Sequence, residues 1–431
     1  MAVANIENPG PSPLSLGADQ ISLDHARQAI AAALVPVVGM DSMPLLAALG
    51  RVLAADVVSP INVPAHDNSA MDGYALDGAA LASNQETVLT IAGSLLAGQG
   101  QAPAVQSGYC VRIMTGAVMP NGTDTVVPLE LCSVEGSPDS GRLHIAAGVL
   151  APGENRRLAG EDLAIGKPAV LAGRVLRPVD LGLIASLGLA EVVVKRRLRV
   201  AVFSTGNELR TLGQNLDDGC VYDSNRFALM GALMRLNMDV LDLGVVRDDP
   251  AALQATLRQA IVSADVVLTS GGVSAGDADH TRAVLAQFGD VAFWKVAMRP
   301  GRPFAFGSVR SAGKGGWLFA LPGNPVAALV AFYALVQPAL QQLAGAVPQA
   351  LPMLKARCGK AIRKRPGRTE LQRGWVSRAA DGRHEVHITG SQGSGILRSM
   401  AQANALVVLA HDQGSVAAGD WVDVWLFDGL V

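Results

Sequence analysis

The sequence predicts a multidomain protein of the α/β and β classes, with a doubly wound α/β domain at its centre. The chain has 431 residues, which at about 150 residues per domain corresponds to roughly three domains. Half of the residues are hydrophobic, which is enough to form several cores. From residue 198 to about residue 341, strand-like runs alternate with helical runs, a pattern typical of a parallel sheet with helices on both faces.

The central domain shows this alternation most clearly. Strands are expected at Arg199–Phe203, Met238–Leu243, Ala264–Thr269, Val291–Val296 and Trp317–Leu321, and helices from Asp223 or Ser224 to Leu236, from Pro250 to Ile261 and after His280. Because crossovers in such sheets are right-handed, the loops after the first, third and last strands should meet at one edge. Open α/β sheets bind their ligands at that edge.

The flanking segments predict different structures. Residues 1–20 are rich in Pro, Gly and Ser, as in a flexible tail. Helices are expected at 22–34, with a serine cap, and at 41–53. Short β-rich runs separated by Gly and Pro at 56–150 predict a small inserted β domain. The chain after residue 345 loses the α/β rhythm and predicts a β-barrel-like domain that ends in a strand at 421–427.

Composition excludes several classes of protein. The 35 basic and 37 acidic side chains leave a net charge of −2, which provides no basic surface for nucleic acid. The four cysteines form no Cys-x-x-Cys pair, which argues against structural zinc and against a disulfide framework. The longest apolar stretch, Pro325–Leu340, is expected to be a buried helix, and no signal peptide is evident. We therefore expect a cytoplasmic protein that binds neither nucleic acid nor membrane.

A glycine-rich and acidic loop, Ser270–His280, follows the third predicted strand. Its glycines, including Gly271 and Gly272, would let backbone N–H groups approach an anion closely. Asp277 and Asp279 could hold Mg²⁺ against that anion, because hard cations prefer oxygen ligands. The alternative is a tight turn whose acids cap the next helix. Neither standard nucleotide-binding glycine motif occurs in the chain.

Further polar segments are expected at the same edge of the sheet. Lys295, Arg299 and Arg302 lie within eight residues beside two prolines and could recognise phosphate or other oxyanions. The alternative for these cations is a solvated surface loop. Glu208 follows the first strand and adds a carboxylate, although a lone Glu in that position is more often exposed than catalytic. His66 is better explained as a structural residue than as a metal ligand, because no second ligand lies near it in the sequence.

Eight short segments, taken in order, resemble motifs of the molybdopterin molybdenumtransferase family, which includes the matching region of gephyrin. These segments are Asp67–Ala75, Arg112–Ala117, Gly160–Asp162, Phe203–Gly206, Asp223–Arg226, Ser270–Ser274, Leu321–Pro325 and Gln392–Gly395. Each segment is a modest signal alone. Their common order over nearly the whole chain makes the resemblance specific.

The resemblance implies four domains. These are a helical linker domain (20–58 and 151–193), an inserted β-rich domain (59–150), a molybdopterin-binding α/β domain (194–345) and a C-terminal β-barrel (346–431). It also implies an elongated homodimer, in which the α/β domain of one subunit shares an active site with the inserted and C-terminal domains of the other. The implied reaction takes adenylylated molybdopterin and molybdate, with Mg²⁺, to molybdenum cofactor and AMP.

The resemblance also assigns roles to individual residues. Asp279 and Glu208 would bind the metal ion and take part in catalysis, with Asp72 and Thr115 as further catalytic residues. The substrate-binding residues would be Ser270, Gly271, Gly272, Ser274, Asp277, Lys295, Arg299, Arg302, Pro322, Pro325 and Ser394. The chain departs from the family at Asn207, where Asp is frequent, and at Arg299 and Arg302, where Lys is common.

Other functions fit the sequence less well. A clustering scaffold related to gephyrin would carry an additional adenylyltransferase domain and a long linker, which do not fit into 431 residues. The enzyme that adenylylates molybdopterin would lack the inserted and C-terminal domains. The choice between molybdenum and tungsten stays open. The resemblance further implies contact with the adenylyltransferase and with proteins that mature molybdoenzymes.

Overall fold

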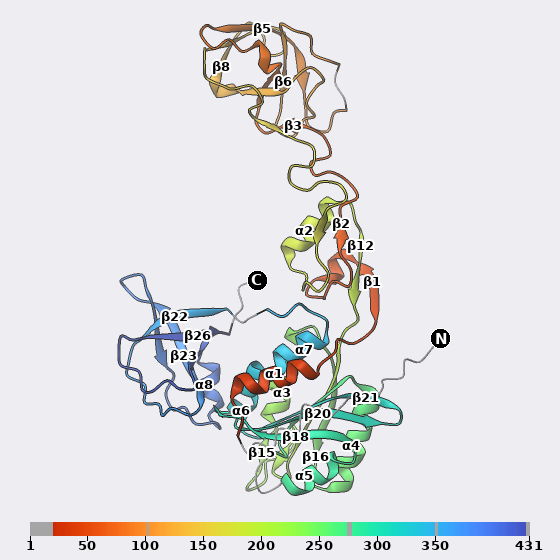
Figure 1. Ribbon diagram of the computed structural model, residues 1–431, viewed down its shortest axis with the longest axis vertical. Coiled ribbons are helices and arrows are strands. Elements are labelled where there is room, and N and C mark those ends of the chain that lie inside the picture. The colour runs from red at the N-terminus through yellow and green to blue at the C-terminus, as the bar shows by residue number, and fades with distance from the viewer. Residues whose placement is uncertain (1–19, 101–102, 274–277, 350–351, 428–431) are drawn as a thin grey trace.

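The computed structural model describes residues 20–100, 103–273, 278–349 and 352–427 and forms an elongated molecule (Figure 1). A small β-rich part lies at one end and connects through a narrow stem to an α/β body. A β-barrel lies beside the α/β body at the other end. The tail expected at residues 1–20 lies, except for its last residue, outside the described residues.

The α/β body contains a six-stranded sheet with the order β16-β13-β17-β21-β20-β18. Its strands are β13 (Arg199–Thr205), β16 (Asp239–Val246), β17 (Val266–Ser270), β18 (Gly289–Lys295), β20 (Pro303–Ser311) and β21 (Lys314–Leu321). The first three and β21 are parallel to one another, whereas β20 is antiparallel to both of its neighbours. The carboxyl ends of β13, β17, β18 and β21 therefore meet at one edge, as the sequence predicted for three of them.

Strand β20 is the element of this sheet that the sequence did not predict. A two-residue turn joins it to β21, with Ala312 at φ 49° and Gly313 at φ 78°. Two consecutive positive φ values define the hairpin turn that matches the twist of paired strands. The sequence signal is weak because Ala occupies the position where Asn or Asp usually stands.

Helices cover both faces of the sheet, which confirms the doubly wound fold. The helices are α3 (Ser224–Arg235), α4 (Pro250–Ser263), α5 (Ala278–Leu285), α6 (Pro325–Ala331) and α7 (Gln337–Leu343). Successive residues of a strand point to opposite faces. Val200 and Val202 of β13 accordingly join the core under α3 and α6, whereas Ala201 and Phe203 join the core under α4.

One long apolar helix crosses this core. It consists of α6, a π-helical turn η4 (Phe332–Val336) and α7. Over Pro325–Leu343 it is long and apolar enough to cross a membrane by length and composition alone, but 67% of its most apolar window is buried inside the protein. The predicted buried helix is thus confirmed, and it extends three residues beyond the expected end.

The N-terminal segment contains one confirmed and one wrong prediction. Helix α1 (Leu23–Ala33) begins after its predicted cap, Ser22, whose hydroxyl accepts a hydrogen bond from the His25 N–H. The helix expected at 41–53 does not form. The chain instead makes β1 (Met40–Pro44) and a short 3₁₀ turn, η1 (Leu45–Ala48). Pro44 lacks the N–H that a helix interior needs, and pairing with β12 (Glu191–Lys195) supplies strand partners.

The stem consists of β1, η1, β2 (Val57–Val58), β11 (Pro168–Val170), α2 (Pro178–Ser186) and β12. The β-rich part has a six-stranded sheet with the order β7-β4-β6-β5-β9-β8. Its elements are β3 (Asn68–Ser69), β4 (Gly73–Leu76), η2 (Gly78–Ala80), β5 (Thr87–Leu95), β6 (Tyr109–Ile113), β7 (Thr125–Pro128), η3 (Leu129–Leu131), β8 (Cys132–Glu135), β9 (Arg142–Ile145) and β10 (Arg156–Arg157).

The C-terminal part is a closed five-stranded barrel, which confirms the predicted β-barrel. Its strands are β22 (Met353–Cys358), β23 (Thr369–Arg378), β24 (His384–Ile388), β25 (Ala405–Leu409) and β26 (Trp421–Leu426), with one short helix, α8 (Leu397–Ala401). Pairing between β23 and β25 closes the ring. A two-residue strand of the α/β body, β19 (Met298–Arg299), pairs with β23 and joins the barrel to the body.

Candidate active site

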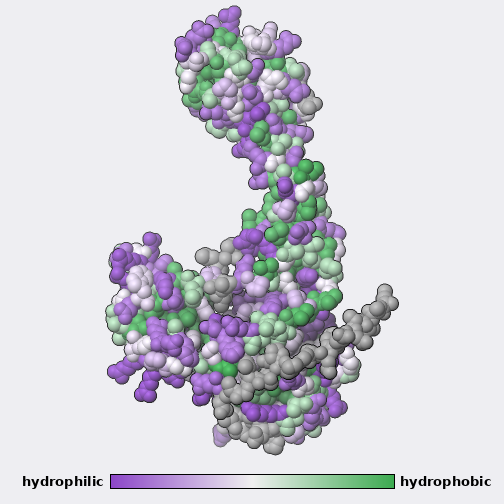
Figure 2. All heavy atoms as spheres, in the orientation of Figure 1, coloured by the Kyte–Doolittle hydropathy of each residue, from purple (hydrophilic) through white to green (hydrophobic). Residues whose placement is uncertain are grey.

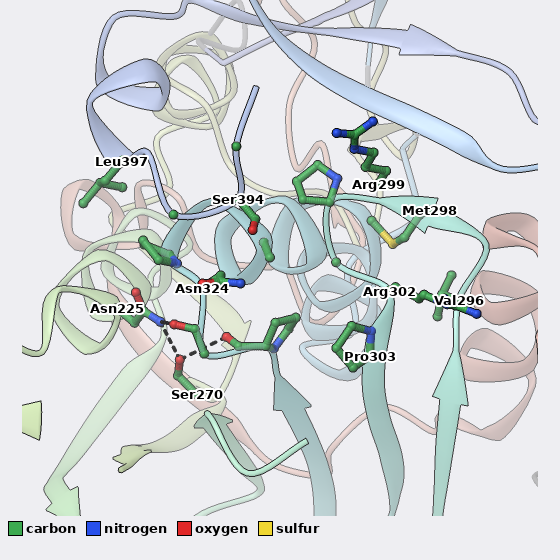
Figure 3. A pocket seen from close by; sticks show the side chains of 18 of the residues that line it. Asn225, Ser270, Val296, Met298, Arg299, Arg302, Pro303, Asn324, Ser394 and Leu397 are labelled. Carbon is green, nitrogen blue, oxygen red and sulfur yellow. Dashed lines mark hydrogen bonds between the residues drawn. The ribbon is translucent and has the colours of Figure 1, made fainter. Parts of the chain in front are cut away.

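A cavity of about 1420 Å³ lies at the carboxyl edge of the α/β sheet, between that edge and the barrel (Figure 3). Ser204 at the end of β13, Ser270 at the end of β17 and Pro322 after β21 all line it. The three loops therefore meet as the sequence predicted. The barrel forms the opposite wall through its loops at 365–368 and 392–395.

Seven of the predicted site residues line this cavity: Glu208, Ser270, Arg299, Arg302, Pro322, Pro325 and Ser394. Gly271 and Gly272 directly follow the lining residue Ser270. Lys295 ends β18 at the same edge but is not among the residues that line the cavity.

Five predicted residues remain. Ser274 and Asp277 lie outside the described residues. Asp279 lies in the first turn of α5, which begins at Ala278 and so includes the last three residues of the segment predicted as the glycine-rich loop. Asp72 and Thr115 lie in the β-rich part, at the opposite end of the molecule from the cavity (Figure 1).

A buried ionic network fixes the strand ends beneath the cavity. Asp223 caps α3, and its carboxylate accepts hydrogen bonds from the Ser204 hydroxyl (3.0 Å) and from Nε of Arg226 (2.9 Å). Arg226 also donates to Asp242 of β16. Asp223 and Arg226 are buried. The network therefore ties β13, β16 and the start of α3 together.

Asn225, one residue before Arg226 in the same helix, connects two of the loops that line the cavity. Its Nδ2 donates to Ser270 Oγ (2.8 Å) and to the carbonyl oxygen of Gly323 (2.7 Å). Figure 3 shows these bonds at one side of the cavity, with Asn324 and Ser394 nearby. Sequence reasoning placed Asn225 inside a family motif but gave it no role.

Four arginines line the cavity, and Figure 3 shows two of them, Arg299 and Arg302, on the side away from Asn225. Arg299 and Arg302 come from the segment after β18, and Arg365 and Arg368 come from a barrel loop that the sequence did not single out. Within the described part of the chain, Arg299, Arg302 and Arg365 have no carboxylate partner. Arg368 donates from Nε to the buried carboxylate of Glu370 (2.9 Å). The wall that carries Arg299 and Arg302 therefore holds positive charge with no carboxylate partner among the described residues.

Arg373 supports the barrel wall of the cavity from within the barrel. It is fully buried and donates to the Gly393 carbonyl (3.0 Å) and to Ser399 Oγ (3.1 Å), which fixes the loop that carries Ser394. Burial, together with the nearby charge of Arg299, lowers the pKa of the Arg373 guanidinium to about 10. The sequence gave no signal for this residue, because it lies mid-strand in β23.

The turn after β17 requires glycine. Gly271 has φ +96°, and a Cβ atom there would lie 2.5 Å from the carbonyl oxygen of Thr205 and 2.8 Å from its Oγ1. Residues that carry a side chain rarely adopt that φ, and atoms at these distances overlap. Glycine is therefore required here by the close approach of Thr205, and the approach of an anion to this backbone stays a prediction.

Glu208 offers a carboxylate to the cavity. The side chain is exposed, lines the cavity and has no ion-pair or hydrogen-bond partner among the described residues. No group of three or more His, Cys, Asp or Glu side chains gathers as a metal site within those residues. The chemistry of Glu208 fits one ligand of a hard cation whose other oxygens come from elsewhere.

Asp72 and Thr115 form an ordered pair at the exposed surface of the β-rich part. Asp72 Oδ1 accepts hydrogen bonds from the backbone N–H (2.7 Å) and the hydroxyl (2.8 Å) of Thr115. These two bonds lower the pKa of Asp72. The pair therefore presents an ionised carboxylate in a fixed position, without a cavity of its own.

Three family descriptions match the chain in order. They are the MoeA N-terminal region (domain I and II) over residues 21–188, the "Probable molybdopterin binding domain" over 201–342, and the MoeA C-terminal region (domain IV) over 355–427. A curated relative from Haemophilus influenzae is 40% identical over 412 residues, covering 95% of this chain and 100% of the relative. The chain belongs to the MoeA family.

Other relatives agree along nearly the whole length. The Haemophilus influenzae relative is named molybdopterin molybdenumtransferase. The Mycobacterium tuberculosis protein named molybdopterin molybdenumtransferase 2 is 36% identical, covering 89% of this chain and 94% of its own. The crystal structure of the molybdopterin biosynthesis moeA protein from Pyrococcus horikoshii OT3 superposes with a TM-score of 0.80 at 26% identity, over 95% of this chain and all of that one. The family resemblance expected from the sequence motifs is confirmed.

Proposed function

We propose that the protein is a molybdopterin molybdenumtransferase, which inserts molybdate into adenylylated molybdopterin and releases AMP. Curated relatives of that name along nearly the whole chain support this function. The observation that carries it is a cavity at the ligand edge of the sheet that is lined by Glu208 and by three arginines without carboxylate partners among the described residues.

The cavity provides what this reaction needs. Breaking the pyrophosphate link requires that negative charge on phosphate oxygens be neutralised by groups held in place beforehand. Arg299 and Arg302 would bind phosphate or molybdate oxygens, with Lys295 close to them along the chain. Arg365 approaches from the barrel, and Ser394 adds a hydroxyl from the adjoining loop. Arg side chains bind two oxygens of an anion at once, which suits both phosphate and molybdate.

Glu208 and Asp279 would hold a Mg²⁺ ion. Glu208 lines the cavity without a partner among the described residues, and α5, which carries Asp279, begins after the glycine loop at the same edge. When bound, such an ion supplies positive charge to phosphate oxygens. The residues of the chain itself would orient the substrate and keep its reacting link beside that charge.

A second copy of the chain would complete the site, because Asp72 and Thr115 lie far from the cavity of their own chain. The four domains would divide at the boundaries expected from the sequence. Exposed apolar side chains gather over the stem (Figure 2), among them Met40, Leu46 and Val179. Apolar surface of this kind is typical of contacts between subunits.

The test is AMP release from adenylylated molybdopterin by the purified full chain, with Mg²⁺ and molybdate. The wild-type protein should release AMP, and Asp279→Ala should abolish release without loss of fold. Asp290→Ala removes an exposed acid of the same domain and serves as the matched control. Unchanged turnover in Asp279→Ala would remove that residue from the site.

Three further measurements belong to the same test. Tungstate in place of molybdate distinguishes the two metals, and ATP consumption with free molybdopterin would indicate the preceding adenylylation reaction instead. Sedimentation velocity tests the shared site. An active monomer would contradict the need for a second copy.

A further inference from the structure

The amide of Asn225 is oriented by partners that leave only its oxygen for a ligand. The carbonyl of Gly323 can only accept a hydrogen bond, so the atom 2.7 Å from it must be the amide nitrogen. The Ser270 hydroxyl donates to the Pro322 carbonyl (3.4 Å), which leaves its lone pair to accept from the same nitrogen at 2.8 Å. Both amide hydrogens of Asn225 are therefore used.

The remaining atom, Asn225 Oδ1, is a pure acceptor on the cavity wall. Asn225 lines the cavity, and Oδ1 has no hydrogen-bond partner among the described residues. Figure 3 shows the oxygen on the side of the amide that faces away from Ser270. Because rotating the amide would place its oxygen against the Gly323 carbonyl, the acceptor cannot change into a donor without breaking the link between the two loops.

This acceptor and the arginines lie on different parts of the cavity wall, so the two parts should bind different chemical groups. The wall around Asn225 holds no arginine or lysine among the described lining residues and includes Ser224, Gly323, Asn324 and the carboxylate of Asp223, which is paired with Arg226, whereas the arginines come from the segment after β18 and from the barrel. An acceptor repels the oxygens of phosphate or molybdate and attracts an N–H group. Anionic groups should therefore lie on the arginine side, and a neutral donor should lie on the Asn225 side.

We infer that Asn225 is a specificity-determining residue, whose Oδ1 accepts a hydrogen bond from a ring-edge N–H group on the organic part of the substrate. The inference rests on the proposed function, which supplies two such groups. One is the amino-pyrimidinone edge of the pterin, and the other is the exocyclic amine of adenine. A site built around a buried or fixed acceptor rejects analogues that lack the donor.

The experiment measures equilibrium binding of AMP, IMP, molybdopterin and molybdate to the full-length wild type and to Asn225→Ala. IMP has the phosphate and ribose of AMP, but a carbonyl oxygen replaces the exocyclic amine, so the exocyclic atom is an acceptor that cannot donate to Asn225 Oδ1. If adenine is the donor, wild type prefers AMP to IMP by about 3- to 10-fold, the worth of one hydrogen bond, and the variant loses this preference. If the pterin is the donor, AMP and IMP bind alike, and molybdopterin binding weakens by a similar factor in the variant.

Molybdate binding separates recognition from a purely structural role. If Asn225 recognises a donor, molybdate and IMP should bind the variant as they bind wild type. An equal loss for all four ligands would mean that Asn225 only holds the loops together, and no loss for any ligand would mean that it contacts none; either result overturns the inference. Asn207→Ala, an exposed amide outside the cavity wall, should leave every ratio unchanged.

These measurements are independent of turnover. A wild-type protein that binds the ligands with the expected ratios but releases no AMP would contradict the proposed function and leave the recognition by Asn225 standing. A protein that releases AMP but shows none of the expected ratios would contradict only the inference about Asn225.

Discussion

The buried ion pair beneath the cavity gives the sharpest stability prediction. Asp223→Ala removes the partner of Arg226 Nε, the cap of α3 and the acceptor of the Ser204 hydroxyl. The two charged side chains are only 1% and 4% exposed, so the arginine would be left buried with Asp242 as its remaining ionic partner. Breaking a buried pair from one side costs about 3–5 kcal/mol, and the remaining partner favours the lower end of this range.

An exposed pair in the same sheet provides the matched control. Arg199 and Asp239 lie 3.0 Å apart with side chains 56% and 52% exposed. Solvent screens such a pair, so Asp239→Ala should cost less than about 1 kcal/mol. Both variants remove one aspartate of an ion pair from the same domain. They differ in the burial of the pair and in the α3 cap and the Ser204 hydrogen bond, which only Asp223 provides.

Hydrogen exchange of the full-length protein is the appropriate assay, because a multidomain chain need not unfold in one step. Amides of β13 and α3 should exchange about a hundredfold faster in Asp223→Ala, which corresponds to roughly 3 kcal/mol. The same amides in Asp239→Ala should change by no more than a few-fold. If the two variants accelerate exchange equally, burial does not determine the strength of this pair and the reasoning fails.

Three further predictions concern single residues. Gly271→Ala should lower the stability of the α/β body by about 2–4 kcal/mol, from backbone strain and overlap with Thr205, and an unchanged midpoint of thermal unfolding would contradict this. Thr115→Val removes one of the two groups whose hydrogen bonds lower the pKa of Asp72, so a ¹³C NMR titration should show that carboxyl protonating at higher pH than in wild type. Burial raises the pKa of the Cys110 thiol to about 12, so iodoacetamide at neutral pH should modify this residue only after unfolding, as mass spectrometry can test.

The sequence predicted the central sheet well because its pattern is local. The run Val200–Phe203 is apolar throughout, as expected for a strand covered on both faces, and it divides between the two cores. Because the crossovers between parallel strands are right-handed, the loops that follow the strands lie at one edge of the sheet. Ser270 and Pro322 could therefore be placed together from the sequence alone. The prediction of a helix at 41–53 was wrong. The apolar spacing of the segment is typical of a helix, but Pro44 disfavours one and the chain pairs with β12 instead.

Other parts of the site could not be predicted from local pattern. Arg365 and Arg368 reach the cavity only because the barrel packs against the α/β body, and no periodicity reports a contact between such distant segments. Arg373 lies mid-strand, where a cation is usually exposed, and its burial depends on a loop twenty residues later. The role of Asn225 depends on which of its atoms face the carbonyl of Gly323, which no sequence pattern encodes.

The pairing of β19 with β23 has a mechanical consequence. Arg299 lies opposite Glu370 in this ladder, so the backbone that carries a cavity arginine belongs to the barrel sheet as much as to the α/β body. If the barrel rotates relative to the α/β body, Arg299 and Arg368 should move with the barrel, whereas Asn225 should stay with the central sheet. Such a rotation would change the distance between the arginines and Asn225. The site could therefore bind substrates and products of different length while keeping the same contacts at each end of the molecule.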